Sequence, residues 1–149
     1  MSGATPGQPL VDPTALRVAR EAAGITQHGL ARLIGVAGGE RVSRWERGAS
    51  EPRPEALHRI AEVLEVDVQT LLIPSESGAD LRRLRVLAGL SARQVAERTH
   101  VSVPTYARWE SGHIERLPSQ GALETLAETL NVTVSEVRAA LSAARRGGE

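Results

Sequence analysis

The stretch GITQHGLARLIGVAGGERVSRWERG, residues 24–48, decides the fold of this chain. Its apolar residues recur at spacings of three and four, which predicts two short helices at 27–34 and 39–47. Thr26 stands directly before the first helix, where a hydroxyl side chain is a good N-cap. Ala31 supplies the small residue that two closely crossing helices need. The second helix is therefore expected to pack one face and present a polar face to solvent.

The same stretch returns once, as GLSARQVAERTHVSVPTYARWESG at residues 89–112. Around it a wider pair of repeats aligns, Leu16–Leu72 with Leu81–Leu141, in the same order and at an offset of about 65 residues. Repeat one carries one extra residue before its Trp, within Ala37–Gly39, and repeat two carries two extra residues after Gly112. The repeats predict two domains of one kind in tandem.

Breaker residues divide the chain further. We expect a flexible tail at 1–12, a first domain at 13–73, a linker at 74–79, a second domain at 80–144 and a C-terminal tail at 145–149. The predicted helices span 13–23, 27–34, 39–47, 53–64 and 68–72, and then 80–88, 92–99, 103–111, 119–130 and 134–144. The fold class is therefore all-α, with two tandem five-helix domains.

Both repeats resemble the Cro/C1-type, or XRE-like, helix-turn-helix family of phage and bacterial regulators. The residues that carry the resemblance are Gly24–Ala31, Gly35-Val36 and Val42–Gly48 in repeat one, and Gly89–Ser91, Val95-Ala96, Val101-Ser102 and Trp109–Gly112 in repeat two. The resemblance implies two lambda-repressor-like domains. It also implies that the second helix of each motif lies in the major groove of duplex DNA and reads base edges there.

By the same resemblance, the DNA contacts of repeat one fall on the residues before Trp45 and on the start of the preceding helix. They are Gln27, His28, Gly39, Glu40, Arg41, Arg44 and Arg47. Arg41 and Arg44 are the best placed, because one arginine can bind a guanine through two hydrogen bonds. Gln27 and His28 are expected near a phosphate or a base.

In repeat two the matching DNA contacts are Val103, Thr105 and Arg108, with Pro104 between them. This face carries fewer hydrogen-bond donors, and Ala92 stands where repeat one has Gln27. Val103 and Pro104 can touch thymine methyl groups, but their side chains cannot hydrogen-bond a base edge. The two reading faces are therefore expected to differ.

Other matched residues are expected to be structural. Arg20 with Glu46, and Arg85 with Glu110, have the spacing of the family's internal ion pair between the first helix and the end of the third. Trp45 and Trp109 are expected in the core beside an apolar helix face. Tyr106 lies three residues before Trp109, as Val42 lies three before Trp45, so we expect it to be partly buried.

Composition narrows the function classes. The chain has no cysteine, and its four histidines lack metal-ligand spacing, so we expect no metal, no cofactor and no enzyme activity. The first 15 residues lack a signal-peptide pattern and no stretch is long and apolar enough for a membrane span, so we expect a cytoplasmic, nucleoid-associated protein. All 18 basic residues are arginine, and 18 acidic residues balance them to a net charge of zero.

Three functional hypotheses follow. The first is a sequence-specific regulator of transcription, a repressor by expectation, whose two repeats dock on neighbouring major grooves of double-stranded DNA. In the second, repeat one binds DNA while repeat two forms a homodimer or binds another protein. The third is an interaction or antitoxin module that keeps the fold without binding DNA, for which the neutral net charge is the best argument.

Overall fold

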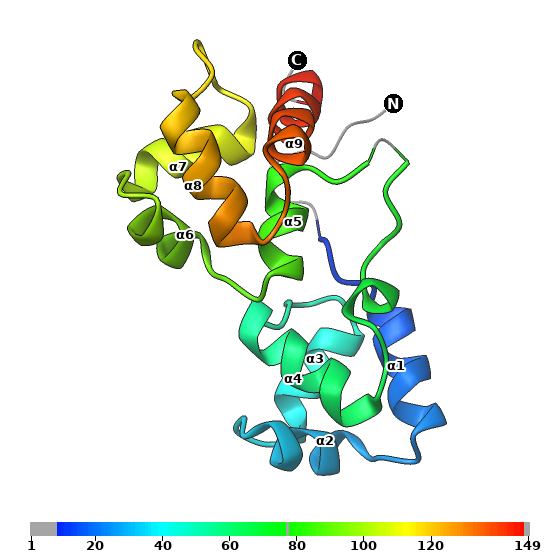
Figure 1. The fold of residues 1–149 in the computed structure, drawn as a ribbon. Coiled ribbons are helices and arrows are strands. Elements are labelled where there is room, and N and C mark those ends of the chain that lie inside the picture. The colour runs from blue at the N-terminus through cyan, green and yellow to red at the C-terminus, as the bar shows by residue number, and fades with distance from the viewer. Residues whose placement is uncertain (1–8, 77, 148–149) are drawn as a thin grey trace. The chain divides into compact units, whose positions relative to one another are not determined.

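The computed structural model describes residues 9–76 and 78–147, and its secondary structure there is helical apart from one isolated bridge (Figure 1). The predicted tail residues 1–8 and 148–149, and position 77 of the predicted linker, lie outside the described residues. The chain divides into two compact units between Pro74 and Ser75. The all-α prediction is confirmed, and the two units are called domain one and domain two below.

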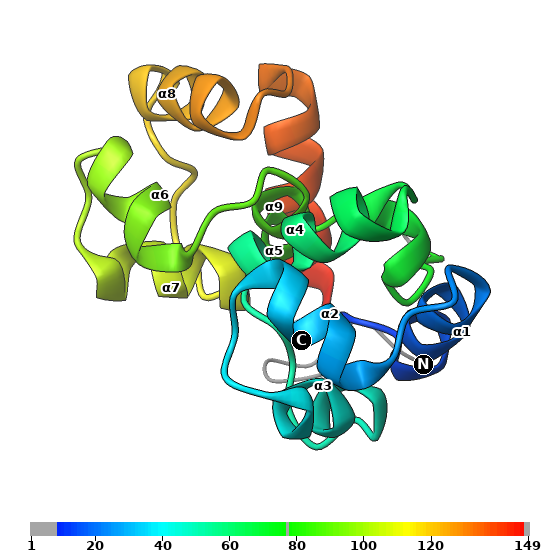
Figure 2. The same ribbon diagram turned by 90° about the horizontal axis from the view of Figure 1, so that it is seen from below.

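Domain one, Pro9–Pro74, is built around the crossing of two short helices (Figures 1 and 2). Its elements are α1 (Pro13–Ala22), α2 (Gln27–Ile34), α3 (Gly39–Glu46), α4 (Pro54–Leu64) and the 3-10 helix η1 (Val68–Leu71). Thr26 caps α2 by accepting a hydrogen bond from the Gly29 N–H, and Gly35 ends that helix in the left-handed conformation. The core contains fully buried Leu16, Leu30, Val42, Leu57 and Ile60.

Domain two repeats this plan with one larger element. Its helices are α5 (Leu81–Leu87), α6 (Ala92–Arg98), α7 (Val103–Ser111), α8 (Gln120–Leu130) and α9 (Val134–Gly147). Helix α9 packs against α5, α7 and α8. Its counterpart η1 packs against α1 and α4 of domain one. Val137, Ala140 and Leu141 of α9 are completely buried.

The structure corrects three predictions about the ends of the domains. The fifth helix of domain one is a 3-10 helix and not an α-helix. Residues 9–12, predicted as part of a flexible tail, are packed: Val11 is 4% exposed and forms an isolated bridge with Leu72. Residues 145–147, predicted as tail, continue α9. In each case tertiary contacts order a segment whose local sequence gives no strong signal.

The aromatic residues of domain two exchange the expected roles. Tyr106, expected to be partly buried, is completely buried, whereas Trp109 is only partly buried beside the same core. Their rings meet edge to face, with centroids 6.2 Å apart. In domain one the smaller Val42 occupies the matching site and Trp45 is 4% exposed. Domain two thus buries the larger Tyr106 completely at the position where domain one buries Val42.

Candidate nucleic-acid interface

The turn between α2 and α3 brings these helices into backbone contact at Gly39. A Cβ atom at this position would lie 2.9 Å from the backbone nitrogen of His28, closer than real Cβ contacts. Gly38, whose φ is 77°, precedes it and caps α3 without a side-chain hydrogen bond. The two glycines thus allow α3 to begin against the start of α2. Since Gly39 has this packing role and no side chain, we place the start of the exposed reading face at Glu40.

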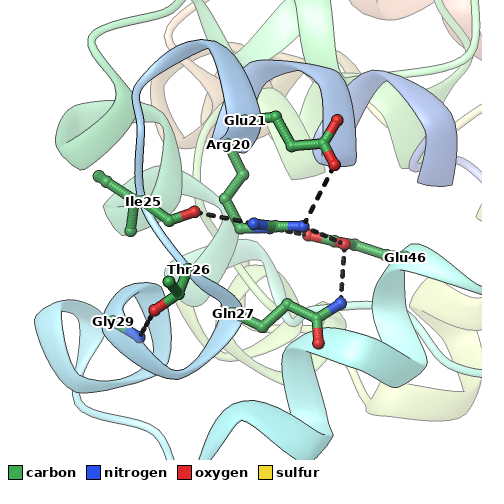
Figure 3. A network of polar contacts seen from close by, with 7 residues as sticks. All are labelled: Arg20, Glu21, Ile25, Thr26, Gln27, Gly29 and Glu46. Carbon is green, nitrogen blue, oxygen red and sulfur yellow. Dashed lines mark hydrogen bonds and ion pairs between the residues drawn. The ribbon is translucent and has the colours of Figure 1, made fainter.

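A buried ion pair ties α1 to the end of α3 (Figure 3). The Arg20 Nε donates to Glu46 Oε2 at 2.5 Å, and the Arg20 Nη2 donates to Glu46 Oε1 at 3.0 Å. The third guanidinium nitrogen, Nη1, donates to the carbonyl oxygen of Ile25 at 2.8 Å. The expected pair is therefore present, and it also holds the turn that precedes α2.

Gln27 joins this network from the first position of α2. Its Nε2 donates to Glu46 Oε1 at 3.0 Å (Figure 3). Burial opposes the ionisation of Glu46, but the hydrogen bonds from Arg20 and Gln27 outweigh it, so the pKa of this carboxyl lies below its ordinary value of 4.5. The carboxylate stays charged and fixes the side chain of Gln27, which sequence alone placed at the DNA.

The solvent face of α3 carries the predicted reading residues. Glu40, Arg41 and Arg44 are exposed, and Arg47 at the end of the helix forms a surface ion pair with Glu40 at 3.7 Å. Among the described residues, the guanidinium groups of Arg41 and Arg44 make no hydrogen bond or ion pair. These two guanidinium groups are therefore available to an external ligand.

An open hollow of about 670 Å³ lies beside this face and adds charged residues that the sequence analysis missed. Arg41 and Arg44 line it together with Arg53, the N-cap residue of α4, and Arg59, from the middle of that helix. Arg59 is held by the Glu55 carboxylate and by the carbonyl oxygen of Ile34, at 3.2 Å. Only the fold brings these arginines beside α3, because they lie outside the repeated motif.

Domain two contains the same ion pair with a different third member. The Arg85 Nε donates to Glu110 Oε2 at 2.5 Å, and its Nη1 donates to the carbonyl oxygen of Leu90 at 3.0 Å. Ala92 replaces the glutamine, and the phenol of Tyr106 lies close enough to both charges to interact with them. Burial raises the pKa of Tyr106, yet its hydroxyl makes no hydrogen bond within the described residues.

Two family models match the chain. One, described as a helix-turn-helix domain, covers residues 14–72, and another, described as helix-turn-helix, covers residues 81–137. Both halves are helix-turn-helix domains. The chain is thus a DNA-binding regulator in general terms. Comparison with curated proteins and with solved structures returned no match.

The reading helix of the second helix-turn-helix domain, α7, has a different outer face from α3. Val103 is 41% exposed, and Pro104 and Arg108 are also exposed. The Thr105 Oγ1 accepts a hydrogen bond from the Ser102 hydroxyl at 2.9 Å, so this predicted contact takes part in the cap of α7. Arg108 is consequently the single charged group among the three residues predicted to contact DNA from α7.

A second open hollow lies at the other end of α7. It is lined by Thr105, Arg108, Trp109, Gly112, His113, Ile114, Glu115, Arg116 and Arg145. Arg116 follows Gly112, in the region where repeat two has its two extra residues, and Arg145 comes from the extension of α9. The insertion was visible in the alignment of the repeats and could have marked Arg116. Arg145 could not be found, because the sequence predicted a tail there.

The predicted contacts at the start of α2 also have neighbours in the helix-turn-helix framework. His28 is exposed, and its Nε2 lies 3.4 Å from Arg32 Nη2 on the next turn. Gln27 is held by Glu46 as described above. Both residues lie at the end of α2 that contacts α3, so they share one side of domain one with Gly39.

Proposed function

We propose that this chain is a sequence-specific, double-stranded DNA-binding transcriptional regulator, and not an enzyme, whose domain one reads the major groove with α3. The observation that supports this most is the pair of available arginines on α3. Arg41 and Arg44 are three residues apart and share one side of the helix. Each guanidinium can bind the O6 and N7 atoms of one guanine, which contributes about 1–3 kcal/mol of discrimination.

The residues around this pair are proposed to position the domain on the DNA backbone. Gln27 and His28 begin α2, and Arg47 follows the last residue of α3. Phosphate contacts of this kind fix the register of a protein on a duplex without reading its sequence. The neutral net charge does not oppose this proposal, because the arginines of α3 are concentrated on one exposed face.

We further infer that the protein acts as a repressor in the cytoplasm. Two DNA-binding domains on one chain would cover a site longer than one half-site, and a protein bound there would exclude other proteins from the same stretch. Docking on successive major grooves requires half-sites about 10 base pairs apart on one face of the duplex. The length of the protected site tests this arrangement directly.

The outer face of α7 favours a second arrangement. Pro104 and Thr105 stand where α3 has the charged Glu40 and Arg41, so domain two would contribute little to the choice of sequence. In this arrangement domain one reads the DNA while domain two supports binding in another way, by dimerisation, by contact with a protein, or by contact with the backbone. Both arrangements use the same domain one.

Selection of binding sites from random DNA with the full chain, followed by footprinting, tests the proposed function. We expect enrichment of a guanine-containing site and an affinity that falls as salt rises, because phosphate neutralisation releases counterions. Affinity that does not fall with salt would contradict DNA binding and would favour an interaction or antitoxin module. A footprint of two half-sites supports paired reading, and a single half-site supports domain one alone.

Three arginine variants then locate the readers. Arg41→Gln and Arg44→Gln should each lose about 10- to 100-fold affinity for the selected site and relax its sequence preference, as expected for one lost guanine contact. Arg17→Gln, on the exposed surface of α1, is the matched control and should bind as the wild type does. An Arg108→Gln loss equal to that of Arg44→Gln would support reading by both domains.

A further inference from the structure

The hollow at the C-terminal end of α7 brings together three arginines that are distant in sequence. Arg108 belongs to α7, Arg116 to the loop that follows it, and Arg145 to α9. All three side chains are exposed, and within the described residues none of them forms an ion pair or a hydrogen bond through its guanidinium group. Glu115 is the one carboxylate among the residues that line this hollow. The hollow therefore has an excess of uncompensated positive charge.

A close backbone contact holds this arrangement together. Gly112 ends α7 in the left-handed conformation, and a Cβ atom there would lie 2.2 Å from the carbonyl oxygen of Ala144 and 3.2 Å from the Cα of Arg145. No residue with a side chain fits between the end of α7 and the last turns of α9. The missing side chain thus places Arg145 beside the end of the reading helix.

The loop that carries Arg116 is anchored as well. Ile114 is 7% exposed and belongs to the core of domain two, and the Ser111 hydroxyl lies 2.9 Å from His113 Nδ1. The same region contains the two extra residues of repeat two, so domain one has no counterpart of it in sequence. The three arginines therefore sit on packed segments that fold independently of any ligand.

We propose that this hollow, named here the arginine hollow, binds the phosphodiester backbone of duplex DNA. Guanidinium groups match phosphate oxygens in pairs of parallel hydrogen bonds, and arginine is the preferred residue for this ligand. The hollow shares Thr105 and Arg108 with the predicted DNA-facing residues of α7, so a strand bound in it runs beside the reading helix. Domain two then contributes affinity and not sequence choice. This inference rests on the proposed function.

Salt-dependent binding of the full chain to two short duplexes, one with the selected site and one of random sequence, tests the arginine hollow. The variants are Arg116→Gln, Arg145→Gln and the double variant. Arg138→Gln is the matched control, because Arg138 lies about 10 Å earlier on the same helix and donates to Gln120 at 2.8 Å. Thermal unfolding followed through Trp109 verifies that each variant keeps domain two folded.

We expect each single variant to weaken binding to both duplexes by the same factor, without changing the selected sequence. The slope of log affinity against log salt should fall by about 0.9 per lost phosphate contact. The difference from the wild type should therefore shrink about 3-fold when salt rises from about 50 to 200 mM. The Arg138→Gln control should keep the wild-type affinity and slope.

The other outcomes separate this inference from the proposed function. If the wild type binds no duplex in a salt-dependent way, the proposed function itself fails. If the wild type binds, Arg44→Gln weakens binding and the hollow variants match the wild type, the arginine hollow is not a DNA contact while the proposed function stands. Inorganic phosphate that binds the wild type but not Arg145→Gln, with duplex affinity unchanged, would assign the hollow to a small phosphate ligand and overturn the proposal. If the variants lose thermal stability while duplex binding stays intact, these arginines stabilise the C-terminal ends of α7 and α9, where the helix dipole is negative. This result would also overturn the proposal.

Discussion

The substitution Glu46→Gln should destabilise domain one selectively. The side chains of Arg20 and Glu46 are 10% and 3% exposed, so the pair is shielded from water on almost all sides. Removing the carboxylate charge leaves the Arg20 guanidinium buried with the carbonyl oxygen of Ile25 and the distant carboxylate of Glu21, 4.0 Å away. Gln27 loses its charged acceptor at the same time. One substitution therefore loosens α1, α2 and α3 together.

The size of the effect follows from this burial. Removing one partner of a buried ion pair costs about 3–5 kcal/mol, because the remaining charge is left without compensation. The substituted amide keeps one oxygen that can accept a hydrogen bond, which places the expected cost near the lower limit, about 3 kcal/mol. A domain of the size of Pro9–Pro74 has about 3–10 kcal/mol of stability in total. The variant should therefore lose at least about a third of this stability, and a domain near the lower limit would not stay folded.

The two tryptophans provide a separate probe for each domain. In a Trp109→Phe background only Trp45 reports, and Trp45 is buried in the core of domain one. Urea unfolding followed by its fluorescence gives the free energy of unfolding with and without Glu46→Gln. Glu62→Gln, on the exposed surface of α4, removes an equal charge and should change that free energy by less than about 0.5 kcal/mol.

Two results would refute this reasoning. A Glu46→Gln variant within about 0.5 kcal/mol of its parent would mean that the buried pair contributes no more than a surface pair does. An equal loss in domain two, measured as the Trp109 signal that remains when the Trp109→Phe signal is subtracted from that of the unsubstituted background, would mean that the substitution acts on the whole chain and not on the packing of α1 against α3.

Three further predictions concern single features. The pKa of Glu46 is lowered in the folded domain, so its ionisation stabilises the domain fully above the ordinary value of 4.5. This stabilisation is lost as pH falls through the lower, folded-state pKa. Acid unfolding followed through Trp45 should reveal this component, which should be missing in Glu46→Gln. Gly39→Ala should lower the free energy of unfolding of domain one, measured in urea, by about 1–3 kcal/mol. The clash with the His28 backbone outweighs the roughly 1 kcal/mol gained in helix propensity. A stabilised variant would contradict the close approach of Gly39 to His28. Tyr106→Phe should leave domain two as stable as before, or up to about 1 kcal/mol more stable. The substitution removes a buried hydroxyl that makes no hydrogen bond in the described structure. A loss of stability above about 1 kcal/mol would show that the hydroxyl supports the neighbouring ion pair.

The sequence predicted most helix boundaries because the signals for them are local. Thr26, Ser91 and Ser102 each cap the helix that follows, as a hydroxyl at that position indicates. The extra residue within Ala37–Gly39 left the start of α3 open, and the structure explains the glycine at position 39 by its backbone contact with His28. That contact joins two segments through space, so no local pattern could reveal it.

The parts that sequence reasoning missed all depend on packing between distant segments. The complete burial of Tyr106 and the partial burial of Trp109 are properties of the packed domain-two core, which no spacing rule describes. The extension of α9 is ordered by its contact with Gly112, more than 30 residues away. Arg145 was assigned to a tail for this reason. The candidate site was therefore predictable along α3 and α7, and not where other segments fold back upon them.

Comparison of the two repeats separates framework from function within one chain. At Arg20 and Arg85, and at Glu46 and Glu110, the repeats keep the same residue, and the structure places it in the same internal contacts. On the outer face of the second helix they differ, with Glu40 and Arg41 against Pro104 and Thr105, and the segment after this helix contains the two extra residues of repeat two. A shared framework with two different outer faces is what one chain needs if one domain chooses the sequence and the other adds affinity. Replacing Glu40 and Arg41 by the proline and threonine that α7 has at these positions should therefore relax the sequence preference, because Arg44 is left as the single guanine reader, while domain one stays folded. Selection from random DNA measures the preference, and Trp45 fluorescence measures the folding.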